Sequence, residues 1–297
     1  MNWRRRGVPW FEAPGTQCPQ ALWYTAAGPP DAPPLLMLHG FLGTHVTWQP
    51  LVRGLRQTHR VVRPDLYGHG RSGIPSDGGH LDPDGLARDL LALMASVAAG
   101  SFSLVGYSMG GRIALRMAAA APAHVARLVL VSASAGIPDA AERDARRRAD
   151  AALAAQIEAS GLDAFLARWD QTPVLASGRP LTEAQRRRLA HDRARHRPEG
   201  IAASLRHTGA GSQVDSGPLL PAWSVPTLLV AGRRDGKYVA SMRQMAAMIP
   251  GAQLAIVESV GHRVPLEAPV ALAGLVSRFL TGLRVPTVPG PPGHSAG

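Results

Sequence analysis

Cysteine is almost absent from the sequence, because Cys18 is the only one in 297 residues. A single thiol cannot form a disulfide within the chain, which fits a reducing compartment but also suits many exported proteins. Because Cys18 lies far from the motifs that carry chemistry, we expect it to have a structural role and not a reactive one.

Long apolar runs are also missing. No uninterrupted stretch reaches the length needed to span a membrane, although 45% of the residues are apolar and can bury a large core. Residues 1–6 end in three arginines and are followed by Gly7-Val8-Pro9-Trp10, where a signal peptide would have its apolar segment. We therefore expect a globular protein of the cytoplasm with no membrane partner.

Lysine and aromatic residues are scarce. The formal net charge of +11 comes almost wholly from arginine, because Lys237 is the only lysine, and aromatic residues make up 5% of the chain. A basic protein can bind nucleic acid, but no basic stripe interleaved with aromatics occurs, so we expect no nucleic-acid partner. The arginines become significant if several converge on one pocket, since a guanidinium can clamp a carboxylate through two hydrogen bonds.

Short apolar runs of β-forming residues alternate with helical patterns along most of the chain. The helical pattern of residues 86–98 lies between two such runs. An alternation of this kind is typical of a parallel sheet with helices on both faces. The runs that we expect to form strands are 35–38, 60–63, 103–106, 128–132, 227–231 and 253–257. The predicted fold class is α/β, with a mostly parallel sheet.

The alternation stops between Ser134 and Ser224. This stretch is densely charged and contains only helical patterns, including 140–159 and 182–196, so we expect a helical lid where the strands end. The residues after Thr281 are rich in proline and lack periodicity, which is typical of disorder. The predicted division is a core of residues 1–134 and 224–281, a lid of residues 135–223 and a disordered tail of residues 282–297.

A nucleophile elbow is predicted at Gly106-Tyr107-Ser108-Met109-Gly110. An apolar run ends there and an alanine-rich helical pattern begins, so the serine would lie in a sharp turn between a strand and a helix. Such a turn strains the backbone and requires glycine two residues before and two residues after the serine. The N-terminus of the helix would direct amides and a partial positive charge toward an oxyanion beside Ser108.

Asp235 and His262 are the candidates for the acid and the base of a catalytic triad. In this architecture the order along the chain is serine, acid, histidine, and both candidates follow a predicted strand at its C-terminal end. A solvated loop aspartate is the alternative for Asp235, and an ordinary surface or core histidine is the alternative for His262. His191, His196 and His207 lie in the lid without metal-ligand spacing, so we expect no metal.

The glycine-rich turn of residues 39–43 follows the first of these predicted strands. It can direct a backbone amide at the space above the serine. We therefore expect the oxyanion hole to consist of the amides of Phe41 or Leu42 together with that of Met109. Residues 68–73 satisfy G-x-G-x-x-G, but a loop rich in proline and glycine follows them instead of a helix, which argues against a dinucleotide site.

These motifs resemble those of the α/β-hydrolase superfamily over residues 20–281. The resemblance is closer to one family within it, the 2-succinyl-6-hydroxy-2,4-cyclohexadiene-1-carboxylate synthases of menaquinone biosynthesis. The segments that carry this closer resemblance are 106–112, 142–150, 165–169, 173–174 and 235–238, whereas residues 65–72 support the resemblance to the superfamily. The sequence departs from the family pattern in a glycine-rich segment at 209–218 and in Arg263-Val264-Pro265 after the histidine, and both departures affect the expected shape of the pocket.

The resemblance implies a lyase that needs no metal or organic cofactor. In this family the triad removes a carbon-bound proton next to a succinyl ketone, and the resulting enolate expels pyruvate. Arg112, Arg146 and Arg193 match family positions that hold the carboxylates of the substrate, although a solvated charged face is the alternative for the two lid arginines. Tyr107 would hydrogen-bond the substrate and Trp169 would wall the pocket, or both would pack under the lid.

Two rival functions share these motifs. A carboxylesterase or a hydrolase of carbon-carbon bonds would use the same triad, but a neutral ester would leave the buried cations without partners. A non-catalytic, ligand-binding member of the fold would keep the pocket while the triad decays, whereas Ser108, Asp235 and His262 are all present. The oligomeric state is not indicated by the sequence.

Overall fold

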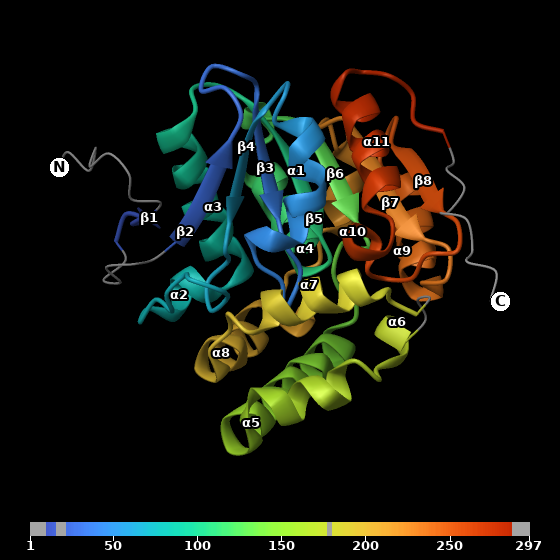
Figure 1. The fold of residues 1–297 in the computed structure, drawn as a ribbon. Helices are drawn as coiled ribbons and strands as arrows, with labels where there is room; N and C mark the ends of the chain where they lie inside the picture. Colours follow the sequence, from blue (N-terminus) through green and yellow to red (C-terminus); the bar gives the residue numbers. More distant parts are fainter. Residues whose placement is uncertain (1–9, 16–21, 177–179, 287–297) are drawn as a thin grey trace.

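The apolar runs of the sequence form a single mixed sheet (Figure 1). The computed structural model describes residues 10–15, 22–176 and 180–286, and within them eight strands are ordered β1-β2-β4-β3-β5-β6-β7-β8. The strands are β1 (Trp10–Phe11), β2 (Leu22–Ala27), β3 (Pro34–Leu38), β4 (Arg60–Pro64), β5 (Phe102–Tyr107), β6 (Val125–Val131), β7 (Thr227–Gly232) and β8 (Gln253–Val257). All six predicted strands are present and pair in parallel, whereas β1 and β2 pair antiparallel at one edge.

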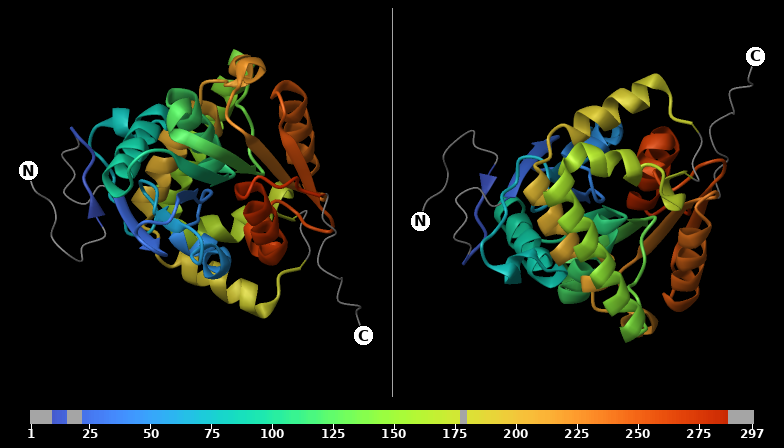
Figure 2. Two further views of the ribbon diagram at one scale, coloured as in Figure 1. Left: turned by 90° about the horizontal axis from the view of Figure 1, so that it is seen from above. Right: turned by 90° about the horizontal axis from the view of Figure 1, so that it is seen from below.

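Helices cover both faces of the sheet, as predicted (Figure 2). One face is covered by α1 (Gln49–Leu55) and α11 (Pro269–Leu280). The other is covered by α3 (Pro83–Val97), α4 (Met109–Ala120) and α9 (Gly236–Met248). Short helical turns, α2 (Gly78–Leu81), α10 (Val264–Glu267) and the 3-10 segments His45–Trp48, Pro122–His124, Ala210–Ser212 and Gly217–Ala222, connect the longer elements.

The apolar core consists of two clusters, one on each face, because neighbouring residues of a strand point to opposite sides. Leu36 and Leu38 of β3 pack with α3, α4 and α9, whereas Leu35 and Met37 pack with α1 and α11. The central strands are apolar on both faces and therefore read as continuous hydrophobic runs in the sequence.

In its described residues, the segment between β6 and β7 forms four α-helices below the C-terminal ends of the strands (Figure 1). They are α5 (Ala140–Trp169), which bends at Gly161, α6 (Pro173–Ala176), α7 (Glu183–Arg193) and α8 (Pro198–Thr208). The expected division into core and lid stays a prediction. Of the predicted disordered tail, residues 282–286 are described and form no helix or strand. Residues 287–297 and Cys18 lie outside the described residues.

The lid packs against the core through both side chains and backbone. Its apolar cluster includes Ile157, Phe165 and Leu205, together with Leu42 from the loop that follows β3. Gly200 of α8 and Gly68 approach so closely that a Cβ atom on either would lie 2.3 Å or less from the carbonyl oxygen of the other. Among the described helices, none is both long and apolar enough to cross a membrane.

The glycine contact between lid and core gives a direct test of this packing. Gly200→Ala is expected to lower the free energy of unfolding by about 1–3 kcal/mol, because its methyl group collides with the backbone at Gly68. Gly274→Ala in α11 is the matched control, since a Cβ there meets nothing within 4 Å, and it should raise stability by about 0.5–1 kcal/mol. Urea unfolding measures both changes, and equal effects would contradict the contact.

Candidate active site

Ser108 occupies a strained turn between β5 and α4. Its backbone has φ 52° and ψ −113°, a conformation that side-chain-bearing residues rarely adopt. A Cβ on Gly106 would lie 2.4 Å from the carbonyl oxygen of Gly110, and one on Gly110 would lie 2.4 Å from that of His39. Both glycines are therefore required by the turn, as the sequence predicts for a nucleophile elbow.

The structure brings the three predicted triad residues together. The Ser108 hydroxyl lies 3.0 Å from Nε2 of His262, and Nδ1 of His262 lies 2.7 Å from a carboxylate oxygen of Asp235. Asp235 and His262 are buried, which disagrees with a solvated aspartate and with a surface histidine. Burial agrees with the alternative of a core histidine, but the ring of His262 contacts both Ser108 and Asp235. An ionised carboxylate accepts from Nδ1–H, which leaves Nε2 as the atom that accepts from the serine.

Asp235 and His262 follow β7 and β8, and the carboxylate of Glu267 holds the loop that carries His262. Asp235 precedes the first turn of α9, and His262 lies in the loop between β8 and α10. The buried carboxylate of Glu267 accepts hydrogen bonds from the amides of Gly261, at 2.8 Å, and Arg263, at 3.2 Å. These two residues flank His262, so Glu267 fixes the loop that carries the imidazole.

The loop after β3 passes directly beside the nucleophile. A Cβ on Gly40 would lie 3.2 Å from Cβ of Ser108 and 2.9 Å from the ring of Tyr107. The next residue, Phe41, lines the cavity at the triad together with Met109. This close approach supports the predicted oxyanion hole, whose assignment to the amides of Phe41 or Leu42 and Met109 stays a prediction.

A cavity of about 860 Å³, including its open mouth, lies over the triad. Its ionisable lining is cationic: Arg112, Arg146 and Lys237 line it beside His262, and no carboxylate does so among the described lining residues. Tyr107, Tyr238 and Trp169 supply aromatic surface. We refer to this cavity as the triad pocket, and its charge suits an anionic ligand.

Two of the three predicted carboxylate-binding arginines line the triad pocket. Arg112 is buried and donates to the carbonyl oxygens of Thr208, at 2.9 Å, and Gly209, at 3.2 Å. Thr208 is the last residue of α8, and Gly209 begins the glycine-rich segment that departs from the family pattern. Nε of Arg146 lies 2.9 Å from the carboxylate of Asp150, while the remainder of its guanidinium is without a partner among the described residues.

The third arginine, Arg193, lines a neighbouring cavity that we call the second chamber. Phe41, Tyr107, Trp169 and Leu175 line both cavities and so form the wall between them. Trp169 also stacks on Phe165 at a ring-centroid distance of 5.3 Å, so it both walls the pocket and packs within the lid. The expected substrate-binding roles of Arg112, Arg146, Arg193, Tyr107 and Trp169 stay predictions.

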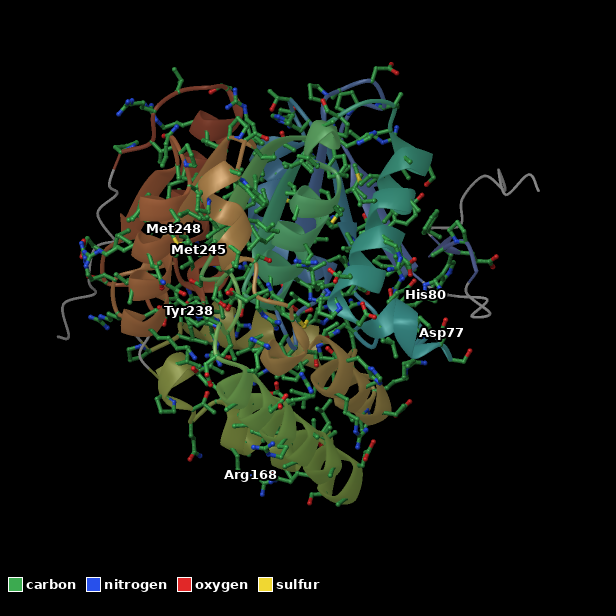
Figure 3. All side chains as sticks on the ribbon, turned by 180° about the vertical axis from the view of Figure 1, so that it is seen from behind. Asp77, His80, Arg168, Tyr238, Met245 and Met248 are labelled. Atoms are coloured by element: carbon green, nitrogen blue, oxygen red, sulfur yellow. The ribbon has the colours of Figure 1, made fainter. Side chains whose placement is uncertain are left out.

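Aromatic rings flank the catalytic imidazole. The ring centroid of Tyr238 lies 4.6 Å from that of His262, and that of Tyr107 lies 5.5 Å away. Burial raises the pKa of both phenols, so each remains a neutral hydrogen-bond donor. Figure 3 shows Tyr238 on α9 where the core faces the lid.

Buried polar residues brace the loop beside the nucleophile. Nδ1–H of His39 donates to the carbonyl oxygen of Gly40 at 2.8 Å, and its Nε2 accepts from the amide of Leu66 at 2.9 Å. His39 therefore braces this loop from within the core. From the lid, the carboxylate of Asp192 accepts hydrogen bonds from the hydroxyls of Thr44 and Thr47, so α7 is fastened to the same loop.

Sequence reasoning missed several residues at the site. Lys237, Tyr238 and Arg263 line the two cavities, and each lies within three residues of a predicted triad member. Lys237 and Tyr238 end one of the segments that carry the family resemblance, and Arg263 begins a departure from it, but none of the three was assigned a role at the site. Within the part of the chain that is described, no group of three or more potential ligands is placed to hold a metal ion.

A Ser-His-Asp array at the C-terminal ends of a mostly parallel sheet defines a protein of the α/β-hydrolase class, and comparison with known proteins agrees. A family model described as the alpha/beta hydrolase fold matches residues 33–269, and the chain belongs to that family. A solved structure of MenH from S. aureus superposes with a TM-score of 0.83 at 28% identity, covering 87% of this chain and 98% of that one.

Two similar proteins narrow the assignment to one family within this fold. A protein of Bacillus subtilis (strain 168), provisionally named a 2-succinyl-6-hydroxy-2,4-cyclohexadiene-1-carboxylate synthase, is 34% identical over 86% of this chain and 93% of its own. The synthase of that name from Salmonella schwarzengrund (strain CVM19633) is 32% identical over 85% of this chain and 96% of its own. Within the α/β-hydrolase fold, the chain therefore belongs to this family of synthases.

The hydrogen bonds by which Glu267 holds the loop of His262 can be tested without a substrate. Glu267→Gln replaces one accepting oxygen by an amide group that faces an N–H donor, so His262 should lose its alignment with Ser108. We expect labelling of Ser108 by a fluorophosphonate to slow about tenfold or more, because proton transfer depends on this alignment. Glu258→Gln, which removes an exposed partner of Arg233, is the control and should label normally. An unchanged labelling rate in a folded Glu267→Gln protein would contradict the role of Glu267 in aligning His262.

The buried histidine beneath the loop predicts a loss of stability in acid. Burial lowers the pKa of His39 to about 4, against about 6.5 in the unfolded chain. The unfolded state therefore binds a proton first, and stability is lost as the pH falls from about 6.5 to about 4, by up to about 3 kcal/mol from this group. Denaturant unfolding at pH 7.5 and pH 4.5 measures the loss, which should be smaller in His39→Gln. An equal loss in the variant would exclude His39 as its source.

Proposed function

We infer that the protein is a lyase that eliminates pyruvate from 2-succinyl-5-enolpyruvyl-6-hydroxy-3-cyclohexene-1-carboxylate. The other product is 2-succinyl-6-hydroxy-2,4-cyclohexadiene-1-carboxylate, an intermediate of menaquinone biosynthesis. The observation that carries this inference is an aligned Ser108–His262–Asp235 array in a pocket whose ionisable lining is cationic. The named relatives support the same reaction. The partner is thus a small polycarboxylate, and we propose the cytoplasm as the location.

The reaction begins with removal of a proton from the carbon next to the succinyl ketone. Asp235 holds Nδ1–H of His262, so Nε2 is free to draw the proton of the Ser108 hydroxyl at 3.0 Å. Ser108 then accepts the carbon-bound proton directly or relays it to the imidazole. The electron pair of the broken C–H bond forms the enolate. When the ketone re-forms, this electron pair shifts the double bond of the ring, and the C–O bond to the enolpyruvyl group breaks with its electrons on oxygen. The leaving enolate is then protonated on carbon to give pyruvate.

The enolate oxygen needs hydrogen-bond donors at the moment when it carries charge. The amides of Phe41 or Leu42 and of Met109 would supply them, aided by the N-terminus of α4. Each such donor contributes about 2.7–4 kcal/mol to stabilisation of the transition state. These donors are backbone atoms of two glycine-rich turns, so they need no rearrangement during the reaction.

The charge of the pocket separates this function from an esterase reaction on the same triad. Arg112 is buried, and burial lowers its pKa because it disfavours the charged form, so an anion nearby would stabilise the guanidinium. A neutral ester brings no such anion, whereas the proposed substrate carries three carboxylates. A lyase acting on an anionic substrate therefore accounts for the arginines, and an esterase does not.

Release of pyruvate is the decisive test. The wild-type protein should produce pyruvate and the conjugated diene from the proposed substrate. Pyruvate is detected by a coupled enzymatic assay, and the diene is detected by its ultraviolet absorbance. Ser108→Ala should reduce kcat by about 10²–10⁴-fold, the range for loss of a positioned proton acceptor. Arg146→Gln should mainly raise KM, because it removes a cation from the pocket wall.

A p-nitrophenyl ester is the control substrate for this assay, and exposed Arg168→Gln on the outer side of α5 is the matched control variant (Figure 3). The control variant should behave as the wild type. Hydrolysis of the ester without any release of pyruvate would reject the lyase and leave a hydrolase of unknown substrate.

A further inference from the structure

The second chamber adjoins the triad pocket and has its own charged lining. It encloses about 600 Å³, including its open mouth. Besides the shared wall, it is lined by Arg188, Arg193 and Arg263, the carboxylate of Asp192, and the apolar side chains of Leu42, Leu189, Pro265 and Leu266. It is therefore a partly apolar space with a concentration of guanidinium groups, next to the pocket that His262 lines.

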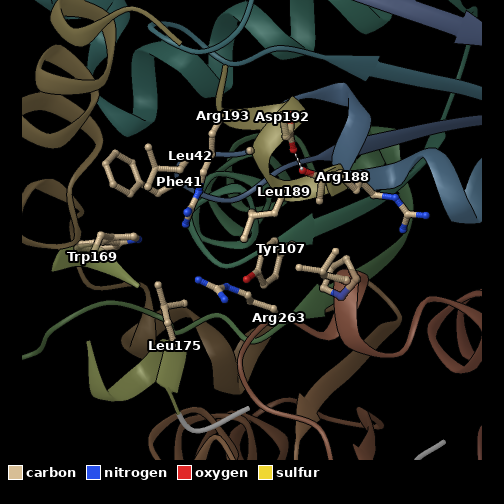
Figure 4. Close-up of a pocket in the computed structure, with 14 residues that line it drawn as sticks. Phe41, Leu42, Tyr107, Trp169, Leu175, Arg188, Leu189, Asp192, Arg193 and Arg263 are labelled. Atoms are coloured by element: carbon tan, nitrogen blue, oxygen red, sulfur yellow. Dashed lines mark hydrogen bonds between the residues drawn. The ribbon is translucent and has the colours of Figure 1, made fainter. Parts of the chain in front are cut away.

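Two of these arginines converge from different parts of the fold. Arg193 extends from α7 of the lid, and Arg263 extends from the loop that follows His262 (Figure 4). Their guanidinium groups point into the space between Trp169 and Tyr107, whereas that of Arg188 points away. Both converging side chains are largely buried, at 11% and 14% exposure.

One carboxylate serves both guanidinium groups. Asp170 accepts from Nη1 of Arg193 at 2.5 Å and from Nη2 at 2.7 Å, and it also accepts from Nη2 of Arg263. Burial alone would raise the pKa of Asp170, but the hydrogen bonds and charges of the two arginines lower it, so the carboxylate is ionised at neutral pH. Asp170 is itself 39% exposed and lies outside the lining of the chamber.

The charges in this cluster do not balance. Two guanidinium groups share one carboxylate, and both oxygens of Asp192 accept from the hydroxyls of Thr44 and Thr47. Arg188 and the carboxylate of Asp192 also line the chamber, so three guanidinium groups stand against two carboxylates, and one positive charge is in excess among the described residues. Nε of Arg193 is also buried without a hydrogen-bond partner among them. A buried cation in excess favours an anion beside it.

We propose that the second chamber is a carboxylate subsite in which Arg263 is a further substrate-binding residue, acting with Arg193. Asp170 is a positioning residue that holds the two guanidinium groups in a fixed orientation toward the chamber. The assignment of its ligand rests on the proposed function, because that substrate has three carboxylates. Arg112 already donates to lid carbonyls, so a carboxylate of the substrate needs cations elsewhere. The carboxylate that the second chamber would hold is that of the enolpyruvyl arm or that of the succinyl arm.

Steady-state kinetics of Arg263→Gln test the subsite. We expect KM for the proposed substrate to rise at least about tenfold with kcat within about threefold, since a charge-assisted contact is lost. A purely structural role, in which the variant displaces His262, would instead lower kcat and leave KM unchanged. Arg193→Gln should reproduce the rise in KM, and it serves as the second variant if Arg263→Gln does not fold. Exposed Arg168→Gln is the matched control and should change neither constant.

Pyruvate and succinate, used as separate inhibitors, identify the arm that the subsite holds. Selective loss of pyruvate inhibition in Arg263→Gln, by about tenfold or more, assigns the enolpyruvyl carboxylate, and selective loss of succinate inhibition assigns the succinyl carboxylate. If Arg263→Gln leaves KM and both inhibition constants unchanged, the subsite does not exist.

A binding measurement separates this inference from the proposed function. Pyruvate or succinate should raise the Tm of the wild type but not that of Arg263→Gln, and this readout needs no turnover. A wild type that releases no pyruvate yet shows this difference in Tm would reject the lyase and retain the subsite. A wild type that releases pyruvate but whose Tm responds equally in the variant would retain the lyase and reject the subsite.

Discussion

The site depends on the close approach of three backbone segments around Ser108. Gly106 and Gly110 allow the turn that raises the serine above the sheet, and Gly40 lets the neighbouring loop pass against it. A methyl group at Gly106 or Gly110 would collide with backbone, which cannot move aside as a flexible side chain can. The strain at Ser108, with φ 52°, persists because the surrounding sheet and helix fix both ends of the turn.

Most of the core and the triad could be predicted from the sequence because both follow from local patterns. Parallel strands buried on both faces appear as short apolar runs, and each triad residue comes just after such a run. Strands β1 and β2 were not predicted, because they are an antiparallel addition at the edge and lack that pattern.

The second chamber could not be predicted for a different reason. Asp170, Arg193 and Arg263 come from the end of α5, from α7 and from the loop after β8, and nothing in their sequence spacing connects them. With arginine abundant throughout the lid, composition could not distinguish the buried Arg193 from exposed neighbours such as Arg186 and Arg187. The distinction arises only when the lid docks on the core and removes some of these side chains from water.

The scarcity of lysine has a practical consequence at the pocket. Lys237, the only lysine of the chain, is exposed and lines the triad pocket beside Tyr238. An amine-selective reagent therefore has one side-chain target in the whole protein, and that target lies at the entrance to the catalytic centre. A fluorophore attached there would report occupancy of the pocket, and the α-amino group at the N-terminus is the other amine that such a reagent can label.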